Sequence, residues 1–396
     1  MAPDGSGYAI TATFNTGGAV TYTLRDIAGD SIVSGTSITD PNNNKIYTTD
    51  GLNYYDTLGQ LALSVTTAGS NPMVYTYTGG NGPATVKVNY SPVSVSTHFG
   101  VSGVSEYSGT PNLVSSILMP DNSSYVFHYD GYGRVSELDL PTGGYTQYQY
   151  STGALVHTVS DRNTTSTWQY TQSWPTTTIT DPSGNQTTVA FGGYFEKLRK
   201  IFQGKADGTG TPVGQVTHCY NYTSAAPCSA AQGGSTTPLA LTIIAQSDGG
   251  SSKQNVTYYG VTQTGEGGFT VHVALPTEVD TYDFGGATPM RKVVTPYGTW
   301  NGTSCAGLAN NLLNRVCYIN VYDSSSNLLS STTSTYDPNG NRTAVSSKAG
   351  STSLTTSVSY FPNGTAQTVT DPNSAQTTYT YGAYHLPIIN NRDASL

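Results

Sequence analysis

The sequence is poor in charge. Asp, Glu, Lys and Arg together make up 10% of its 396 residues, where soluble globular domains have about 25%. The polar surface must therefore come from Ser, Thr, Asn, Gln and Gly, which suit strands and turns better than long solvated helices. The acidic residues point the same way, because 19 are Asp and only 5 are Glu. Asp favours turns, whereas Glu favours helices.

Other shortages exclude whole classes of protein. The 16 Lys and Arg residues are scattered and the net charge is −8, so we expect no nucleic-acid partner. No apolar run reaches the roughly 18 residues that a membrane helix needs. The N-terminus, MAPDGSGYAI, lacks the basic region and apolar core of a signal peptide. The chain is then either cytosolic or a piece of a longer protein. We favour the second, because the C-terminal IINNRDASL lacks the polar cap of a repeat array.

What the sequence does contain is a repeat of about 20 residues, clearest over residues 120–201. Each copy opens with a turn and carries an aromatic residue near its middle. A fixed period in this range is typical of a repeat architecture. The turns open at Pro120, Pro141, Asp161 and Asp181, and the aromatic residues Tyr129, Tyr150, Tyr170 and Phe191 are spaced by 21, 20 and 21 residues.

One copy shows the expected unit. Residues 125–129 alternate as a strand, residues 130–133 form a tight turn, and residues 134–138 form the return strand. Gly131 and Gly133 are expected to supply the positive φ of the turn. The predicted fold class is therefore all-β, with antiparallel hairpins that repeat every 20–21 residues in one long curved sheet.

The regularity of the repeat divides the chain into four segments. Residues 1–119 hold stretched copies and begin with a hairpin over 8–24, and residues 120–201 hold the regular copies. Residues 202–320 are strands interrupted by loops that carry two cysteine pairs, with one or two helical turns expected at 306–314. The pattern returns over 321–396.

The run Tyr129-Asp130-Gly131-Tyr132-Gly133-Arg134 resembles the YD repeat of the Rhs (rearrangement hotspot) family. That family includes bacterial polymorphic-toxin shells, insecticidal toxin complexes and the animal teneurins. The likeness covers residues 38–66, 120–201 and 321–385, about half of the chain. Its further positions are Tyr55, Asp56, Gly59, Tyr150, Tyr170, Asp181, Pro182, Gly184, Tyr336, Asp337, Gly340, Tyr360, Asp371, Pro372 and Tyr381.

The resemblance implies a β-sheet strip with one hairpin per repeat, which in the family spirals into a shell around a toxic C-terminal domain. A chain of this length would form an arc of such a wall. No segment matches the conserved core with which bacterial members close the shell and cleave themselves, and no toxin domain follows. A self-cleaving aspartyl activity is therefore not carried over to this chain.

The four cysteines form two local pairs, Cys219/Cys228 and Cys305/Cys317. Locally paired cysteines in a strand-rich chain predict two disulfide-closed loops and a location outside the cytosol. Free thiols are the first alternative. A metal held by His218, Cys219 and Cys228 is the second, although neither pair has the spacing of a zinc knuckle.

Other candidate sites have simpler structural interpretations. The acidic and amide side chains of 337–341 resemble a calcium loop faintly but suit a turn better. Lys197 and Arg199 favour a solvated or edge-guarding strand face over an anion site. The six His residues and five Glu residues match no catalytic motif. We expect no catalytic residue, metal or cofactor.

Two functions remain open. The first is a non-catalytic scaffold of a secreted or cell-surface bacterial protein, which encloses or displays another domain and has the rest of the same polypeptide as its partner. The second is a carbohydrate-binding or adhesion module, with Trp168, Trp174 and Trp300 as candidate stacking residues for sugars. The alternative for these tryptophans is packing within the sheet. The specific function is expected in the cysteine-bearing insertions at 204–236 and 299–317, or in parts of the protein outside this sequence.

Overall fold

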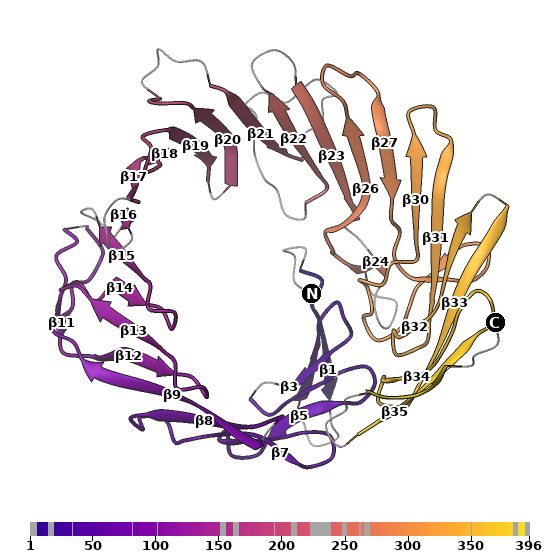
Figure 1. Cartoon of the computed structure of the whole chain (residues 1–396), viewed down its shortest axis with the longest axis horizontal. Coiled ribbons are helices and arrows are strands. Elements are labelled where there is room, and N and C mark those ends of the chain that lie inside the picture. Colours follow the sequence, from indigo (N-terminus) through magenta and orange to yellow (C-terminus); the bar gives the residue numbers. More distant parts are fainter. Residues whose placement is uncertain are drawn as a thin grey trace. The chain divides into compact units, whose positions relative to one another are not determined.

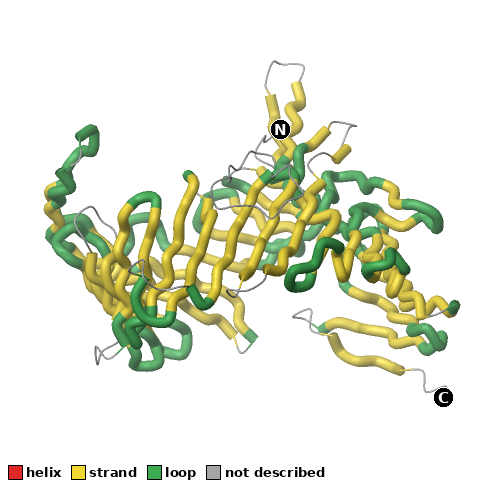
Figure 2. The backbone as a smooth tube through the Cα atoms, turned by 90° about the horizontal axis from the view of Figure 1, so that it is seen from above, coloured by secondary structure: helices red, strands yellow, loops and turns green. Residues whose placement is uncertain are grey.

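The structure is a computed structural model of the whole chain. It describes residues 6–14, 20–33, 35–80, 82–100, 102–150, 156–160, 166–193, 195–206, 212–221, 239–247, 252–260, 263–264, 270–349, 351–382 and 387–392. All regular structure in these ranges is β-strand, and Figure 2 shows strands and loops without a helix. No helix in these ranges has the length and apolar character needed to cross a membrane. The prediction of an all-β fold built from antiparallel hairpins is confirmed.

Contacts between residues divide the chain into two compact units. The chain passes from one unit to the other within β5 and again within β21. One unit comprises residues 48–55 and 59–216. Its strands pair antiparallel in chain order, except that β10 and β11 form a small separate sheet and β9 pairs directly with β12. The strands are β6 (Asn53–Tyr55), β7 (Leu61–Val65), β8 (Met73–Gly79), β9 (Gly82–Pro92), β10 (Val95–Ser96), β11 (Ser108–Gly109), β12 (Asn112–Leu118), β13 (Ser124–Tyr129), β14 (Val135–Asp139), β15 (Tyr145–Tyr150), β16 (Val156–Ser160), β17 (Trp168–Ser173), β18 (Thr176–Thr180), β19 (Gln186–Gly192) and β20 (Phe195–Phe202).

The other unit comprises residues 1–47, 56–58 and 217–396. Its strands also pair antiparallel with their neighbours, side by side as in the orange and yellow part of Figure 1. Two short pairs, β24 with β25 and β28 with β29, stand apart. The strands are β1 (Ala9–Phe14), β2 (Val20–Arg25), β3 (Ser31–Val33), β4 (Ser37–Thr39), β5 (Lys45–Thr48), β21 (Gly214–Tyr220), β22 (Leu241–Ser247), β23 (Ser252–Gly260), β24 (Gln263–Thr264), β25 (Thr270–Val271), β26 (Leu275–Tyr282), β27 (Pro289–Val294), β28 (Thr299–Trp300), β29 (Cys305–Ala306), β30 (Tyr318–Asp323), β31 (Leu328–Tyr336), β32 (Arg342–Ala349), β33 (Thr352–Tyr360), β34 (Ala366–Thr370), β35 (Gln376–Tyr381) and β36 (Pro387–Arg392).

The predicted hairpin at the N-terminus is present, because β1 pairs with β2 from Ala9–Arg25 to Phe14–Val20. The four-part division by repeat regularity follows a different criterion from the contact-defined units and stays a prediction.

The repeat turns share one backbone geometry. In the turn between β13 and β14, the N–H of Gly133 donates to the C=O of Asp130 at 2.9 Å, and Gly133 has a φ of +79°. This is a three-residue hairpin loop, a type I turn closed by a left-handed residue. The equivalent residue in other turns is Gly29, Asn43, Asn122, Gly143, Gly184, Ser326, Gly340, Gly364 or Ser374.

The expectation for Gly131 is wrong, because Gly131 is not among the residues of positive φ. A type I turn keeps its central residues at negative φ and needs the left-handed conformation only at the closing position. The register then shifts by one residue. His128 lies opposite Glu137 and Tyr129 lies opposite Val135, so that Ser136 of the return strand is the extra residue, as expected for a bulge beside such a turn.

Few side chains are fully buried in the described ranges. The apolar ones below 2% exposure are Val273, Leu312, Cys219 and Cys317. Most strand residues are half-buried, and some large apolar side chains are largely exposed, for example Phe14 at 78% and Leu58 at 71%. The described parts of the two units therefore contain few of the buried apolar side chains that fill the core of a two-layer domain.

The expectation of helical turns at 306–314 is wrong. Asn310 and Asn311 both have left-handed φ values, +58° and +59°, which interrupt a right-handed helix. Asn311 is fully buried, and its side-chain amide donates to the C=O groups of Gly7 and Asp26. The segment is thus a loop whose buried residues 311–313 lie against the N-terminal part of the same unit, to which Asn311 is hydrogen-bonded.

Candidate functional site: repeat links and the disulfide loop

The aspartate of the repeat holds its own turn. One carboxylate oxygen of Asp130 accepts hydrogen bonds from the N–H groups of Tyr132 and Arg134, at 2.9 and 3.0 Å. The other oxygen accepts from Nε of Arg134 at 2.8 Å. Asp181 bonds in the same way to Ser183 and Asn185. Each carboxylate thereby satisfies backbone donors that the turn leaves unpaired.

These hydrogen bonds act on the charged form of the carboxyl group. The side-chain amide of Asn185 lowers the pKa of Asp181, and that of Asn327 lowers the pKa of Asp323 in the equivalent turn. Burial is the largest single influence on the pKa of Asp130 and raises it. The hydrogen bonds from the Arg134 side chain and from the N–H groups of Arg134 and Tyr132, together with the Arg134 charge, outweigh burial, so that this pKa is lowered as well. The turns therefore favour ionised aspartates at neutral pH.

The tyrosine of the repeat connects its hairpin to the preceding one. The hydroxyl of Tyr129 donates to the C=O of Val114 at 2.7 Å, and the hydroxyl of Tyr150 donates to the C=O of Val135 at 2.6 Å. Both acceptors lie 15 residues upstream of the donor. The same link recurs in the other unit, from Tyr336 to Val316, from Tyr360 to Arg342 and from Tyr381 to Ala366. We call these contacts the tyrosine links.

Arg134 contacts the tyrosine of one of these links. Its guanidinium forms an ion pair with Asp130 at 2.7 Å and lies over the ring of Tyr150, 4.2 Å from the centroid. A guanidinium over an aromatic face is attracted by the ring quadrupole. The Asp-Gly-Tyr-Gly-Arg run of one repeat thus contacts the tyrosine of the next.

Three further aromatic repeat positions lie in strands. Tyr170 lies in β17 opposite Ile179, and Phe191 of β19 stacks on Trp174 with centroids 6.4 Å apart. Tyr55 ends β6 at a register shift. The repeat opening at Asp161 lies outside the described residues.

The predicted disulfide between Cys305 and Cys317 is present and spans a sequence separation of 12 residues. Cys317 is fully buried, whereas Cys305 lies in β29 opposite Trp300 of β28. Cys219 is also fully buried and disulfide-bonded. Its predicted partner, Cys228, lies outside the described residues, so that this pairing stays a prediction.

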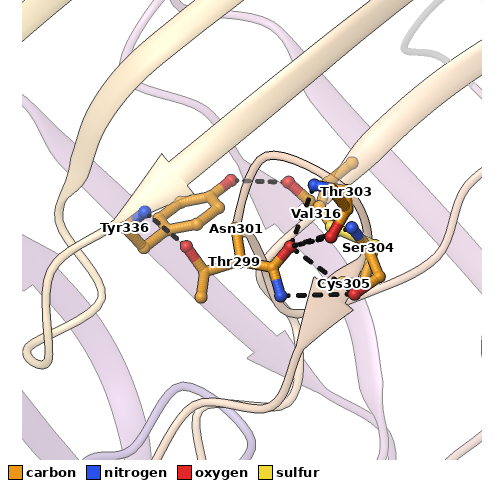
Figure 3. Close-up of a disulfide and its surroundings, with 8 residues drawn as sticks. Thr299, Asn301, Thr303, Ser304, Cys305, Val316 and Tyr336 are labelled. Atoms are coloured by element: carbon orange, nitrogen blue, oxygen red, sulfur yellow. Dashed lines mark hydrogen bonds between the residues drawn. A yellow bond between two sulfur atoms is a disulfide. The ribbon is translucent and has the colours of Figure 1, made fainter.

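Residues 299–317 contain the β28–β29 hairpin and the disulfide, and we call them the disulfide loop. Polar contacts, which Figure 3 shows, shape this loop and fix it to the repeat sheet. Oδ1 of Asn301 accepts from the N–H groups of Thr303 and Ser304, which shapes the tip of the loop. Thr299 Oγ1 accepts from the N–H of Tyr336 at 2.9 Å, and the hydroxyl of Tyr336 donates to the C=O of Val316 at 3.0 Å. A tyrosine link therefore also holds the base of the loop.

A pocket of about 430 Å³ opens beside this loop. Trp300 and Tyr318 meet edge to face in it, with centroids 5.9 Å apart at 89°. Hydroxyl and amide side chains surround the two rings, which is the composition of a pocket for a polar ligand with apolar faces. The lining residues are Pro296, Trp300, Thr303, Ser304, Cys305, Tyr318, Asn320, Ser331 and Thr333.

The three candidate tryptophans do not form one site. Trp168 is 43% exposed and lines a second pocket, of about 470 Å³, with Asp181 and Asn185. Trp174 is 75% exposed and stacks on Phe191. Both belong to the unit of residues 59–216, whereas Trp300 belongs to the other unit.

Two further candidates lie in contacts that favour their structural interpretation. Arg199 forms a double hydrogen bond with the carboxylate of Glu196, at 2.9 and 2.7 Å, so that its guanidinium is already neutralised. The carboxylate of Asp337 accepts from the N–H groups of Asn339 and Asn341 and from the Asn341 side chain. These donors occupy the oxygens that a calcium ion would need.

Sequence reasoning missed one cluster. His128, Glu137 and Asp139 bring their ligand-type atoms within 4.8 Å of one another on β13 and β14. The hairpin prediction contained the signal, because residues that flank a turn of known length face each other across the two strands.

Comparisons with known proteins find neither a family model nor a curated protein that matches the chain. Among solved structures, the chain is similar to the TcdB2-TccC3-TEV crystal structure, with 12% identity and a TM-score of 0.30, over 96% of this chain and 23% of that one. The Photorhabdus luminescens Tc holotoxin pore matches at 11% identity and a TM-score of 0.27, over 96% and 22%. A porin-like protein from Bacteroides uniformis matches at 8% identity and a TM-score of 0.20, over 70% and 90%.

This chain therefore spans less than a quarter of the length of these two toxin chains.

Proposed function

We propose that the chain is a non-catalytic scaffold, a stretch of YD-repeat wall from a secreted or cell-surface bacterial protein that encloses or displays another domain. The observation that carries this proposal is the recurrence of the tyrosine links in both units. Five of them, from Tyr129, Tyr150, Tyr336, Tyr360 and Tyr381, connect a hairpin to a carbonyl 15 to 20 residues upstream. In this proposal the linking tyrosines join neighbouring strands of a wall, which is a structural role and needs no reactive group.

The charge distribution supports the same proposal. The carboxylates of the turn aspartates Asp130, Asp181 and Asp337 accept hydrogen bonds from N–H groups of their own turns. Catalytic carboxylates need an accessible oxygen and a substrate beside it. The turn aspartates therefore act as structural acceptors.

The test uses the polypeptide encoded by the whole gene. Limited proteolysis should leave a segment outside residues 1–396 protected, and that segment should become cleavable when the five linking tyrosines are changed to Phe. The scaffold proposal fails if the gene encodes nothing beyond these residues. It also fails if the additional segments are cut equally fast with intact and with altered links.

A second candidate function is carbohydrate binding at the pocket beside the disulfide loop. The specific observation is the Trp300–Tyr318 pair among hydroxyl side chains, together with Oδ1 of Asn320, which is buried without a hydrogen-bond partner in the described structure. Aromatic faces suit the apolar faces of sugar rings, and hydroxyl groups suit their rims.

A glycan array separates the two candidates. Binding that is lost in Trp300→Ala and retained in Trp168→Ala and Trp174→Ala would support the pocket as a sugar site. A flat array with the wild-type chain, or binding that survives Trp300→Ala, would contradict it and leave the scaffold proposal untouched.

A further inference from the structure

The first hairpin of the regular repeats places three metal-ligand side chains on one face of the sheet. In the pairing of β13 with β14, His128 lies opposite Glu137, and Asp139 lies opposite Val126. Residues two apart on a strand point to the same face, so Asp139 lies beside Glu137 and diagonally across from His128. Diagonal neighbours in an antiparallel pair are within reach of long side chains.

The distances between the three groups fit one ion. Nε2 of His128 is 3.1 Å from Oδ2 of Asp139, and ligand atoms from all three residues lie within 4.8 Å of one another. Tetrahedral zinc with bonds of about 2.0–2.1 Å holds its ligands roughly 3.3 Å apart. The His–Asp pair already has about this spacing. The Glu137 carboxylate lies within 4.8 Å of both groups, so the three side chains must draw closer together when they hold one ion.

The neighbouring strand supports Glu137 from outside the cluster. Gln147 of β15 lies opposite Glu137, and its Nε2 donates to Oε2 of that carboxylate at 2.7 Å. The bond occupies one oxygen and leaves the other for a ligand. Hydrogen bonds of this type from outer residues orient metal-binding carboxylates in known sites.

A surface ion pair between His128 and Asp139 does not account for all of this geometry. Two carboxylates converge on one imidazole, and like charges at this range repel. A divalent cation removes the repulsion and uses all three groups. The site is also accessible, because the side chains of His128 and Asp139 are 51% and 30% exposed, so that water can fill the remaining coordination positions.

We propose that His128, Glu137 and Asp139 bind a divalent first-row transition metal ion, with Zn²⁺ the best match to one imidazole and two carboxylates. The ion joins β13 to β14 across the face of the sheet. This site is independent of the scaffold proposal, because it depends on one hairpin and on none of the tyrosine links.

The test is calorimetric titration of the chain with Zn²⁺ alone. We expect one site per chain that is stronger than any other, weakened more than about tenfold in His128→Ala and in the near-isosteric Glu137→Gln. Gln147→Ala, which removes only the outer hydrogen bond, should weaken the site roughly 10–100-fold. His98→Ala is the matched control, since His98 lies outside the cluster, and should leave the affinity unchanged.

Thermal unfolding supplies a second measurement. Zn²⁺ should raise the unfolding temperature of the wild type and of His98→Ala, but not that of Glu137→Gln, because an ion that binds only the folded chain stabilises it. Circular dichroism must show that each variant is folded. Equal Zn²⁺ affinity in wild type and folded Glu137→Gln, or the absence of a site at one ion per chain, would overturn the proposal and leave a surface ion pair.

Discussion

At the scale of single residues, the repeat turns share one backbone requirement at the position that closes them. The closing residue of each turn has positive φ, and it is Gly in most copies but Asn or Ser in others, such as Asn43 and Ser374. Asn tolerates the left-handed region better than most residues, because its short side chain bonds locally. The repeat therefore tolerates sequence variation at this position while its backbone stays constant.

Gly184 offers a direct measurement of this requirement. Its φ is +86°, and a Cβ added there would meet no atom within 4 Å. Gly184→Ala should thus destabilise its unit by about 1–2 kcal/mol through backbone strain alone, as measured by urea unfolding. Gly184→Asn should cost clearly less, and equal losses in the two variants would contradict the explanation by φ.

Tyr150 tests the tyrosine links. Tyr150→Phe keeps the ring over Arg134 and removes the hydrogen bond to the C=O of Val135, so we expect a loss of about 1 kcal/mol. Tyr148→Phe in the same strand is the control, because the Tyr148 hydroxyl has no hydrogen-bond partner among the described residues. Hydrogen exchange of the β14 and β15 amides should localise the effect. A uniform change across the unit would count against a local link.

At the scale of elements, strand β26, which pairs with β23 and β27, carries a buried aspartate. The side chain of Asp280 in β26 is 7% exposed, and its Oδ1 has no hydrogen-bond partner in the described structure. The nearest cation, Nζ of Lys292, is 4.0 Å away and bonds to Glu278 instead, at 2.9 Å. Burial raises the pKa of Asp280, so ionisation of this residue opposes folding.

The pH dependence of stability should reveal Asp280. A folded-state pKa above the unfolded value means that its contribution is fully present below about pH 3.9 and is lost as the pH rises through the raised pKa. Asp280→Asn should remove this loss and be at least as stable as wild type at pH 7 in denaturant titrations. Wild type that is clearly more stable at pH 7 would contradict the assignment.

Asp323→Asn is the control, because the stability contribution of Asp323 should change with pH in the opposite direction. The pKa of Asp323 is lowered by the Asn327 side chain, so its contribution is present at neutral pH and is lost as the pH falls through the folded-state value. The variant should therefore lose stability at pH 7 and approach wild type in acid.

The disulfide loop is a second element with a measurable contribution. The bond between Cys305 and Cys317 closes a loop with a sequence separation of 12, for which about 2–4 kcal/mol is typical. Replacement of both residues by Ser should lower stability by that amount and change the fluorescence of Trp300, which pairs with Cys305 across β28 and β29. Unchanged fluorescence would show that the contacts of Asn301 and Thr299 hold the loop without the bond.

Local patterns in the sequence predicted the hairpins and their turns, because Asp130 and Gly133 have roles that depend on near neighbours. The tyrosine links could not be predicted, since the acceptor carbonyl depends on strand register. The helical turns predicted at 306–314 failed because Asn311 is committed to partners about 300 residues away. The same limit applies to Asn42 and Asn341, whose side chains bond across a separation of 299 residues.

At the scale of the whole molecule, the pairing of the described strands leaves an edge without a partner. Among the described residues, β36 at the end of the chain pairs with β35 alone. Unpaired edges are sites of strand addition between molecules. The chain should accordingly self-associate with rising concentration, which light scattering can follow. A soluble monomer that unfolds cooperatively at all concentrations would show that its edges are covered.

The tyrosine links also bear on how such a gene can change its length. A hydroxyl that reaches a carbonyl 15 residues upstream finds its partner inside the adjacent repeat. Recombination that adds or removes one complete repeat leaves donor and acceptor in phase on both sides of the junction. Recombination out of phase separates them, and a shift by an odd number of residues also moves the outward side chains to the opposite face of the strand. A change in length by whole repeats thus preserves the hydrogen bonds and the strand faces of this architecture.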